Sequence, residues 1–263
     1  MTFIPHREKA DRTYEPSFSF EGELLSEGHS AVHDDVAAID GWLEPEDSLK
    51  LYELGYLAPG PFLEIGTYRG KSTAVLATAL RDAGRDGEFY SLDIAKDDLA
   101  LARATLAERR LGRDVTLVHG SASAFFRALP GFRPRFVFVD GDHSAKGVGR
   151  DLVALEAHVP QGGLLLFHDF RDDRNNDPAN KEYGVPEAIQ ASWVARDCEF
   201  AGTFGCTGLF RRLRGPQPET GDSDARTLIE LIGFDRVGVR VLVNVARPAK
   251  RWLVKRVAKL RRG

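Results

Sequence analysis

Two short motifs that combine carboxylate and imidazole groups each follow a run of apolar residues. They read V-D-G-D-H at residues 139–143 and F-H-D-F at residues 167–170. Because the carboxyl ends of neighbouring parallel strands meet at one edge of a sheet, we expect the polar side chains of the two motifs to lie close together. Carboxylates and imidazoles bind divalent cations, and an imidazole accepts a proton near neutral pH. The motifs therefore predict a metal and general-base site able to deprotonate an unreactive hydroxyl group.

A glycine-bearing turn lies upstream, in the stretch F-L-E-I-G-T-Y-R-G-K-S at residues 62–72. Gly66 and Gly70 let the chain bend sharply and approach a ligand, and the helix that follows turns its free N–H groups toward the same place. The dinucleotide fingerprint G-x-G-x-x-G is not matched, because Glu64 occupies the first glycine position and Arg69 interrupts the rest. A carboxylate there disfavours a nicotinamide dinucleotide and favours a ligand that carries positive charge.

Two further strand ends are expected beside this turn. The strand E-F-Y-S-L-D at residues 88–93 ends in Asp93, about twenty residues past the turn, where such folds hold a ribose diol. The next strand runs into G-S-A at residues 120–122, which adds small polar groups. Three strand ends thus converge on one nucleotide-like ligand, although Asp93 could instead cap the helix that follows it.

Strands and helices alternate along the middle of the chain. This alternation predicts an α/β fold, a doubly wound parallel sheet with helices on both faces. A short helix over residues 45–56 precedes the first strand. The expected strands cover residues 62–65, 88–92, 114–118, 135–139 and 163–167, and the expected helices cover 71–83, 97–111, 122–129, 146–158 and 185–194.

Taken together, the motifs E-I-G-T-Y-R-G-K-S, S-L-D, G-S-A and V-D-G-D-H resemble those of class I S-adenosylmethionine-dependent methyltransferases. Within that superfamily, V-D-G-D-H-S, the following D-L at 151–152, G-G-L-L-L-F-H-D-F at 162–170 and G-V at 184–185 are similar to the group of macrolide sugar O-methyltransferases and cephalosporin-hydroxylase-like proteins. The resemblance covers about residues 40–212. It implies a mostly parallel seven-stranded sheet that ends in an antiparallel hairpin, here at 199–204 and 208–212.

The resemblance also implies where the cofactor S-adenosylmethionine lies. Glu64 and Gly66 would lie by its methionine part, Asp93 would hold the ribose and Ser121 would border the adenine. The full set of implied cofactor contacts is Glu64, Gly66, Thr67, Tyr68, Gly70, Lys71, Ser72, Asp93, Ser121 and Asp140.

For the reaction itself, the resemblance implies that His143 is the base and that Asp140, His168 and Asp169 bind a divalent cation. A glutamate is usual at the position of His168 in the sugar enzymes. An imidazole there removes one negative charge and replaces a hard oxygen ligand with a softer nitrogen ligand. Manganese, iron or zinc therefore becomes credible beside magnesium. Three alternatives stay open: Asp142 as a metal ligand instead of His168 or beside it, Asp142 as a cap of the next helix, and His168 as a core histidine.

Four regions are expected along the chain. Residues 1–40 would form an arm or cap over the pocket, 41–213 the methyltransferase domain, 214–235 a linker, and 236–263 a basic amphipathic tail. The tail could lie on an anionic membrane, dock on a partner or stabilise a homo-oligomer. Within the domain, the polar segment 171–183 suits a lid over a hydrophilic substrate.

Composition limits the function classes further. The formal net charge of −3 over 263 residues argues against nucleic acid as the main partner. The absence of a long apolar run or of a secretion signal favours a cytoplasmic location. Two cysteines, Cys198 and Cys206, are too few for a disulfide framework and lack metal-knuckle spacing, so both are interpreted as buried or semi-buried thiols.

The leading interpretation is an O-methyltransferase that uses S-adenosylmethionine and a divalent cation, magnesium or manganese, on a small hydroxylated acceptor such as a sugar or glycosylated natural product. One alternative keeps the cofactor without the metal, with His143 or His168 acting alone. A third is a non-enzymatic nucleotide-binding or membrane-associated module in which the tail carries the function.

Overall fold

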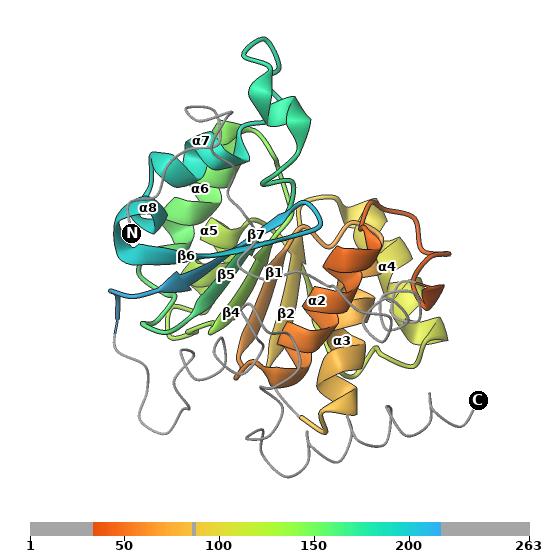
Figure 1. Ribbon diagram of the computed structural model, residues 1–263. Helices are drawn as coiled ribbons and strands as arrows, with labels where there is room; N and C mark the ends of the chain where they lie inside the picture. Colours follow the sequence, from red (N-terminus) through yellow and green to blue (C-terminus); the bar gives the residue numbers. More distant parts are fainter. Residues whose placement is uncertain (1–33, 86–87, 217–263) are drawn as a thin grey trace, which may run out of the picture.

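A single seven-stranded sheet forms the centre of the protein. The computed structural model describes residues 34–85 and 88–216, so the predicted tail and most of the predicted arm and linker lie outside the described residues. The strand order is β3-β2-β1-β4-β5-β7-β6, with parallel pairing from β3 to β5 and antiparallel pairing of β7 with both β5 and β6. The predicted doubly wound sheet with a terminal hairpin is confirmed (Figure 1).

The central strands are apolar because helices cover both of their faces. All four residues of each of β1, β4 and β5 are buried, as parallel strands inside such a fold require. The strands are β1 (Phe62–Ile65), β2 (Phe89–Asp93), β3 (Thr116–His119), β4 (Phe136–Val139), β5 (Leu164–Phe167), β6 (Cys198–Phe204) and β7 (Thr207–Arg212).

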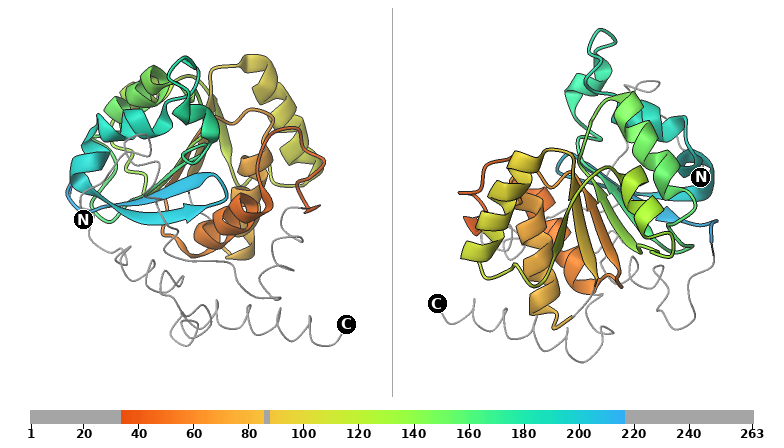
Figure 2. Two further views of the ribbon diagram at one scale, coloured as in Figure 1. Left: turned by 45° about the horizontal axis from the view of Figure 1, so that its top comes forward. Right: turned by 180° about the vertical axis from the view of Figure 1, so that it is seen from behind.

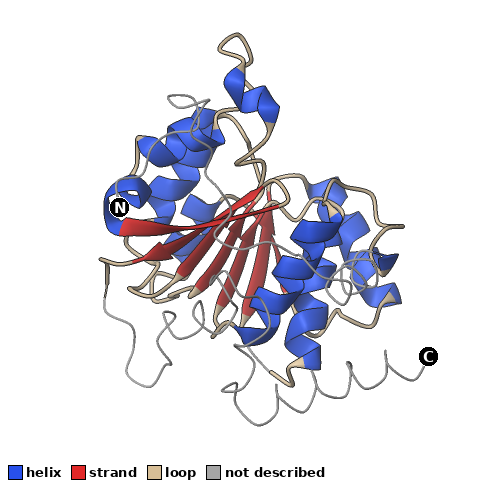
Figure 3. Ribbon diagram, viewed as in Figure 1, coloured by secondary structure: helices blue, strands red, loops and turns tan. Residues whose placement is uncertain are grey.

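The helices form one layer on each face of the sheet (Figures 2 and 3). One layer contains α2 (Pro45–Leu57), α3 (Lys71–Asp82) and α4 (Lys96–Glu108), and the other contains α5 (Ala122–Ala128), α6 (Ala145–Leu155), α7 (Val185–Gln190) and α8 (Trp193–Asp197). Alternate residues of β4 serve the two cores, with Phe136 and Phe138 in the first and Val137 and Val139 in the second. None of the helices in the described segments is long and apolar enough to cross a membrane.

One expectation about the helices needs correction. The single helix expected over residues 185–194 is two helices, because Ser192 has extended backbone angles and its hydroxyl accepts a bond from the N–H of Val194, which starts a new helix. Val36 and Ile39, at the end of the predicted arm or cap, are buried in the core.

The carboxyl ends of the parallel strands are aligned by backbone hydrogen bonds that continue just past the strands. The N–H of Gly66 donates to Leu92 O at 2.8 Å, and the N–H of Asp140 donates to Ile65 O at 2.8 Å. The N–H of His168 likewise donates to Val139 O at 3.0 Å. The polar residues that follow β1, β4 and β5 are therefore fixed beside one another at one edge of the sheet.

Candidate active site

A cavity of about 1310 Å³ opens at this edge of the sheet. Its lining joins the strand ends to the segment 41–44 before α2 and to part of the loop between β5 and α7, which contains the 3-10 helix η2 (Asp173–Asn176). Eleven of the thirteen residues predicted for the site line it: Gly66, Thr67, Tyr68, Lys71, Ser72, Asp93, Ser121, Asp140, His143, His168 and Asp169. The two exceptions are Glu64 and Gly70.

The turn after β1 depends on its two glycines for different reasons. Gly66 has φ +101°, and a Cβ atom there would overlap the carbonyl group of Asp140. Gly70 has φ +87° at the start of α3. A Cβ atom added at Gly70 would lie 3.3 Å from the Cβ atom of Ala102 in α4. Gly66 thus lets β1 and β4 approach each other at the cavity, whereas Gly70 supports the turn from behind.

Glu64 also lies behind the cavity wall. Its buried carboxylate accepts bonds from the hydroxyls of Ser72 at 2.6 Å and of Thr73 and Ser91 at 2.5 Å each. Burial raises the pKa of Glu64 to about 7, although the three hydroxyls oppose that shift. These contacts tie β1, β2 and α3 together, and a direct contact between Glu64 and the cofactor stays a prediction.

Asp93 joins the end of β2 to the glycine turn. Its Oδ2 accepts the N–H of Tyr68 at 2.7 Å, and its Oδ1 accepts the N–H of Ala95 at 2.8 Å. The second bond orders the chain just before α4 without capping the helix, whose N-cap Ala95 has no side-chain cap, and Asp93 lines the cavity. On the other side of the turn, Lys71 Nζ donates to Gly41 O at 2.8 Å, which holds the segment 41–44 against the site.

His143 is held by two neighbours. Its Nδ1 lies 3.3 Å from Oδ2 of Asp169, and its ring stacks on Tyr183 with the centroids 5.4 Å apart and the planes 5° from parallel. The guanidinium of Arg174 covers the same tyrosine at 4.0 Å from the ring centroid. The loop between β5 and α7 therefore reaches the site through Tyr183, while its motion as a lid stays a prediction.

His168 is buried between carboxylates. Its Nδ1 lies 3.0 Å from Asp140 Oδ1 and 3.4 Å from Asp169 Oδ1, yet within the described segments this nitrogen makes no well-directed hydrogen bond. Burial alone would lower the pKa of His168, but the charge of Asp140 and the bond to Cys206 outweigh it, so the pKa is raised well above its ordinary value. Two carboxylates around a buried nitrogen without a directed bond fit a divalent cation by donor type.

Within the part of the chain that the structure describes, the hydrogen bonds of Asp142 lead away from this cluster. Its Oδ1 accepts the N–H of Ser144 at 3.0 Å, and its Oδ2 accepts a bond from Arg150 at 2.8 Å. Ser144 in turn caps α6 by accepting the N–H of Gly147 at 3.0 Å. These contacts support the interpretation of Asp142 as part of the helix start rather than as a metal ligand.

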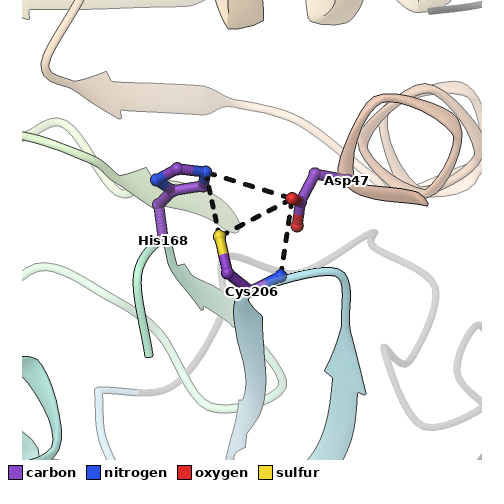
Figure 4. Close-up of side chains that lie close together, drawn as sticks. All are labelled: Asp47, His168 and Cys206. Carbon is purple, nitrogen blue, oxygen red and sulfur yellow. Dashed lines mark hydrogen bonds and ion pairs between the residues drawn. The ribbon is translucent and has the colours of Figure 1, made fainter. Parts of the chain in front are cut away.

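Two residues beside His168 were not predicted from the sequence as site residues. Asp47 lies in the first turn of α2, and Cys206 lies in the turn between β6 and β7. The side chains of both residues approach the Nε2 atom of His168 (Figure 4). Burial raises the pKa of Asp47 to about 6 and the pKa of the Cys206 thiol to about 11. An acidic residue at a helix start and a lone cysteine have ordinary explanations in a sequence, so only the fold reveals their proximity.

The sheet order and the terminal antiparallel hairpin are those of the class I methyltransferase fold. In agreement, residues 63–170 match a family model described as a methyltransferase domain.

Solved structures of methyltransferases share this fold. The O-methyltransferase TomG from Streptomyces achromogenes, involved in tomaymycin synthesis and solved with SAM, is 21% identical, with a TM-score of 0.54 over 74% of this chain and 91% of that chain. An O-methyltransferase from Bacillus cereus solved with SAH is 17% identical, with a TM-score of 0.52 over 73% and 89%. The SAH-bound methyltransferase PaMTH1 from Podospora anserina gives the same identity, TM-score and coverage.

Proposed function

We propose that this protein is an S-adenosylmethionine-dependent O-methyltransferase that acts on a hydroxyl group of a small polar acceptor, such as a sugar or a glycosylated natural product. One observation carries the proposal: a single cavity is lined both by the glycine turn with Asp93 and by the His143–Asp169 pair. The first group suits a nucleoside with an amino-acid arm, and the second suits removal of a proton.

The cofactor half of the cavity lies along β1, β2 and the start of α5. The turn after Gly66 offers backbone N–H groups, Asp93 offers a carboxylate for a ribose diol, and Ser121 offers a small polar edge. S-adenosylmethionine supplies a methyl group on a sulfonium, which is a good leaving group. The residues of the chain therefore need to position the acceptor oxygen in line with that methyl group and to accept its proton.

His143 is the proposed base. With Nδ1 beside the Asp169 carboxylate, the favoured neutral tautomer carries its proton on Nδ1 and leaves the lone pair on Nε2. The acceptor hydroxyl gives its proton to Nε2 as its oxygen takes the methyl group, and Asp169 stabilises the imidazolium that forms. This dyad can act without a metal, so a metal-independent enzyme is the second candidate.

A divalent cation is the proposed additional group. Asp140, His168 and Asp169 would hold it, and when bound it would stabilise the acceptor oxygen as an alkoxide. The imidazole among the donors favours manganese at least as much as magnesium.

The acceptor is proposed to be polar because charged side chains line the cavity beyond the His143–Asp169 pair. They come from α6 and from the loop before α7, and include Arg150, Asp151, Asp172 and Arg174. A polyhydroxylated acceptor can exchange hydrogen bonds with both signs of charge.

Calorimetric titration with S-adenosylhomocysteine tests the cofactor assignment. We expect the wild type to bind it and Asp93→Ala to bind it at least about tenfold more weakly, and equal binding by both proteins, or by neither, would overturn the assignment. Transfer of a labelled methyl group to a panel of sugars and glycosides, before and after chelation and with added manganese or magnesium, then separates the metal-dependent candidate from the metal-independent one.

A further inference from the structure

His168 presents its two ring nitrogens to two different sets of donors. Nδ1 faces the carboxylates of Asp140 and Asp169, as described above. Nε2 lies on the opposite side of the ring, 3.2 Å from Cys206 Sγ and 4.0 Å from Asp47 Oδ2. The second set combines a thiol, an imidazole and a carboxylate, which differs in chemistry from the carboxylate set around Nδ1.

We propose that Asp47, His168 and Cys206 form a zinc site, with His168 contributing Nε2. Zinc accepts sulfur, nitrogen and carboxylate oxygen ligands in tetrahedral sites. Ligand bonds of about 2.0–2.3 Å in tetrahedral geometry separate pairs of ligand atoms by roughly 3.3–3.7 Å. The third separation in the set, between Cys206 Sγ and Asp47 Oδ2, is 3.6 Å, so the three separations bracket that range and the side chains need to move only slightly to bind an ion.

The surroundings supply the outer contacts that zinc ligands usually have. Asp140 Oδ1 lies 3.0 Å from the second ring nitrogen of His168, on the side where a carboxylate commonly orients a metal-bound histidine, although the pair makes no well-directed hydrogen bond in this structure. The remaining oxygen of Asp47, Oδ1, accepts a bond from Thr207 Oγ1 at 2.7 Å. Asp47 is fully buried and His168 nearly so, which holds both side chains in place.

An ion at this site would also have an open side. His168 and Cys206 line the cavity, whereas Asp47 does not. Three protein ligands with a fourth position toward a cavity are the arrangement of catalytic rather than structural zinc sites. The proposal does not rest on methyl transfer, because its test is metal binding.

The test uses the full chain, stripped of metal by a chelator and titrated with Co²⁺ as a spectroscopic substitute and then with Zn²⁺. We expect one equivalent of Co²⁺ to give a thiolate-to-cobalt charge-transfer band, which Zn²⁺ then removes by displacement. Cys206→Ser should abolish the band. The matched control Cys198→Ser, which replaces the other free thiol of the chain, should keep it.

Further variants separate the two donor sets around His168. Asp47→Asn should weaken Co²⁺ binding by at least about 100-fold, because loss of an outer partner alone typically costs 10–100-fold. The double variant Asp140→Asn/Asp169→Asn should keep the thiolate band at saturating Co²⁺, with its affinity lowered by no more than the 10–100-fold typical of an outer partner. Absence of the band in the wild type, or its survival in Cys206→Ser, would overturn the proposal. Loss of the band in the double variant together with its retention in Asp47→Asn would also overturn it.

X-ray absorption of the zinc-loaded wild type provides a test that needs no variant. The spectrum should show one sulfur atom among the atoms bound to zinc. Coordination by oxygen and nitrogen alone would overturn the proposal.

Discussion

The Nδ1 atom of His143 lies 3.3 Å from the Oδ2 atom of Asp169, and this contact joins the loop after β4 to the residues just after β5. Asp169 reaches it from a left-handed backbone conformation, with φ +55°. Such angles are uncommon for residues other than glycine, and aspartate and asparagine tolerate them best. The unusual backbone at this position thus accompanies a contact of the proposed catalytic base.

Asp169→Asn tests this contact because asparagine keeps the size and tolerates the backbone angle while removing the charge. We expect methyl transfer to the best acceptor of the panel to fall by about 10²–10⁴-fold in kcat, the range typical for general acid–base catalysis. The affinity for S-adenosylhomocysteine should stay within about threefold of the wild type. A variant that keeps its kcat would exclude Asp169 from orienting the base.

Tyr183 provides a second test of how His143 is positioned. Tyr183→Ala removes the ring stacked on His143 and frees the imidazole to rotate, so kcat should fall by roughly tenfold. Tyr183→Phe keeps the stacked ring and is the matched control, with activity expected near that of the wild type. If the phenylalanine variant loses as much activity as the alanine variant, the hydroxyl rather than the stacking matters.

The sequence was a good guide to the parallel sheet and to one half of the site. Strands such as β4 are short continuous apolar runs, and each is followed directly by the polar residues that line the cavity, so local order alone predicts their meeting. Asp47 and Cys206 could not be found in this way, because α2 and the β6–β7 turn meet His168 only after the hairpin has packed beside β5. The split between α7 and α8 was missed because a serine cap inside an apolar pattern is a weak signal.

Gly66→Ala tests the close approach of β1 and β4. A methyl group there would overlap the Asp140 carbonyl, and the backbone has φ +101°, so the free energy of unfolding should fall by about 3 kcal/mol or more. Gly84→Ala is the matched control: it also has a positive φ, +65°, but nothing lies within 4 Å of its added methyl group. The free energy of unfolding of Gly84→Ala should fall by only about 1–2 kcal/mol, because only backbone strain is added. Urea unfolding measures both, and equal losses would show that the Asp140 carbonyl is not an obstacle.

Glu64 makes the stability of the protein depend on pH in a defined direction. Burial raises its pKa in the folded state to about 7 from an ordinary value of 4.5, so the folded state holds the proton over a range in which the unfolded state has lost it. Between these two pH values the unfolded state therefore gains relative stability as the pH rises. Glu64→Gln removes the titration, so its free energy of unfolding relative to wild type should increase by about 3 kcal/mol from pH 4.5 to pH 7 and stay level above that. Urea unfolding of both proteins across this range provides the measurement. If the free energies of unfolding of the two proteins change with pH in parallel, the three hydroxyls keep the Glu64 carboxylate ionised and burial does not dominate its pKa.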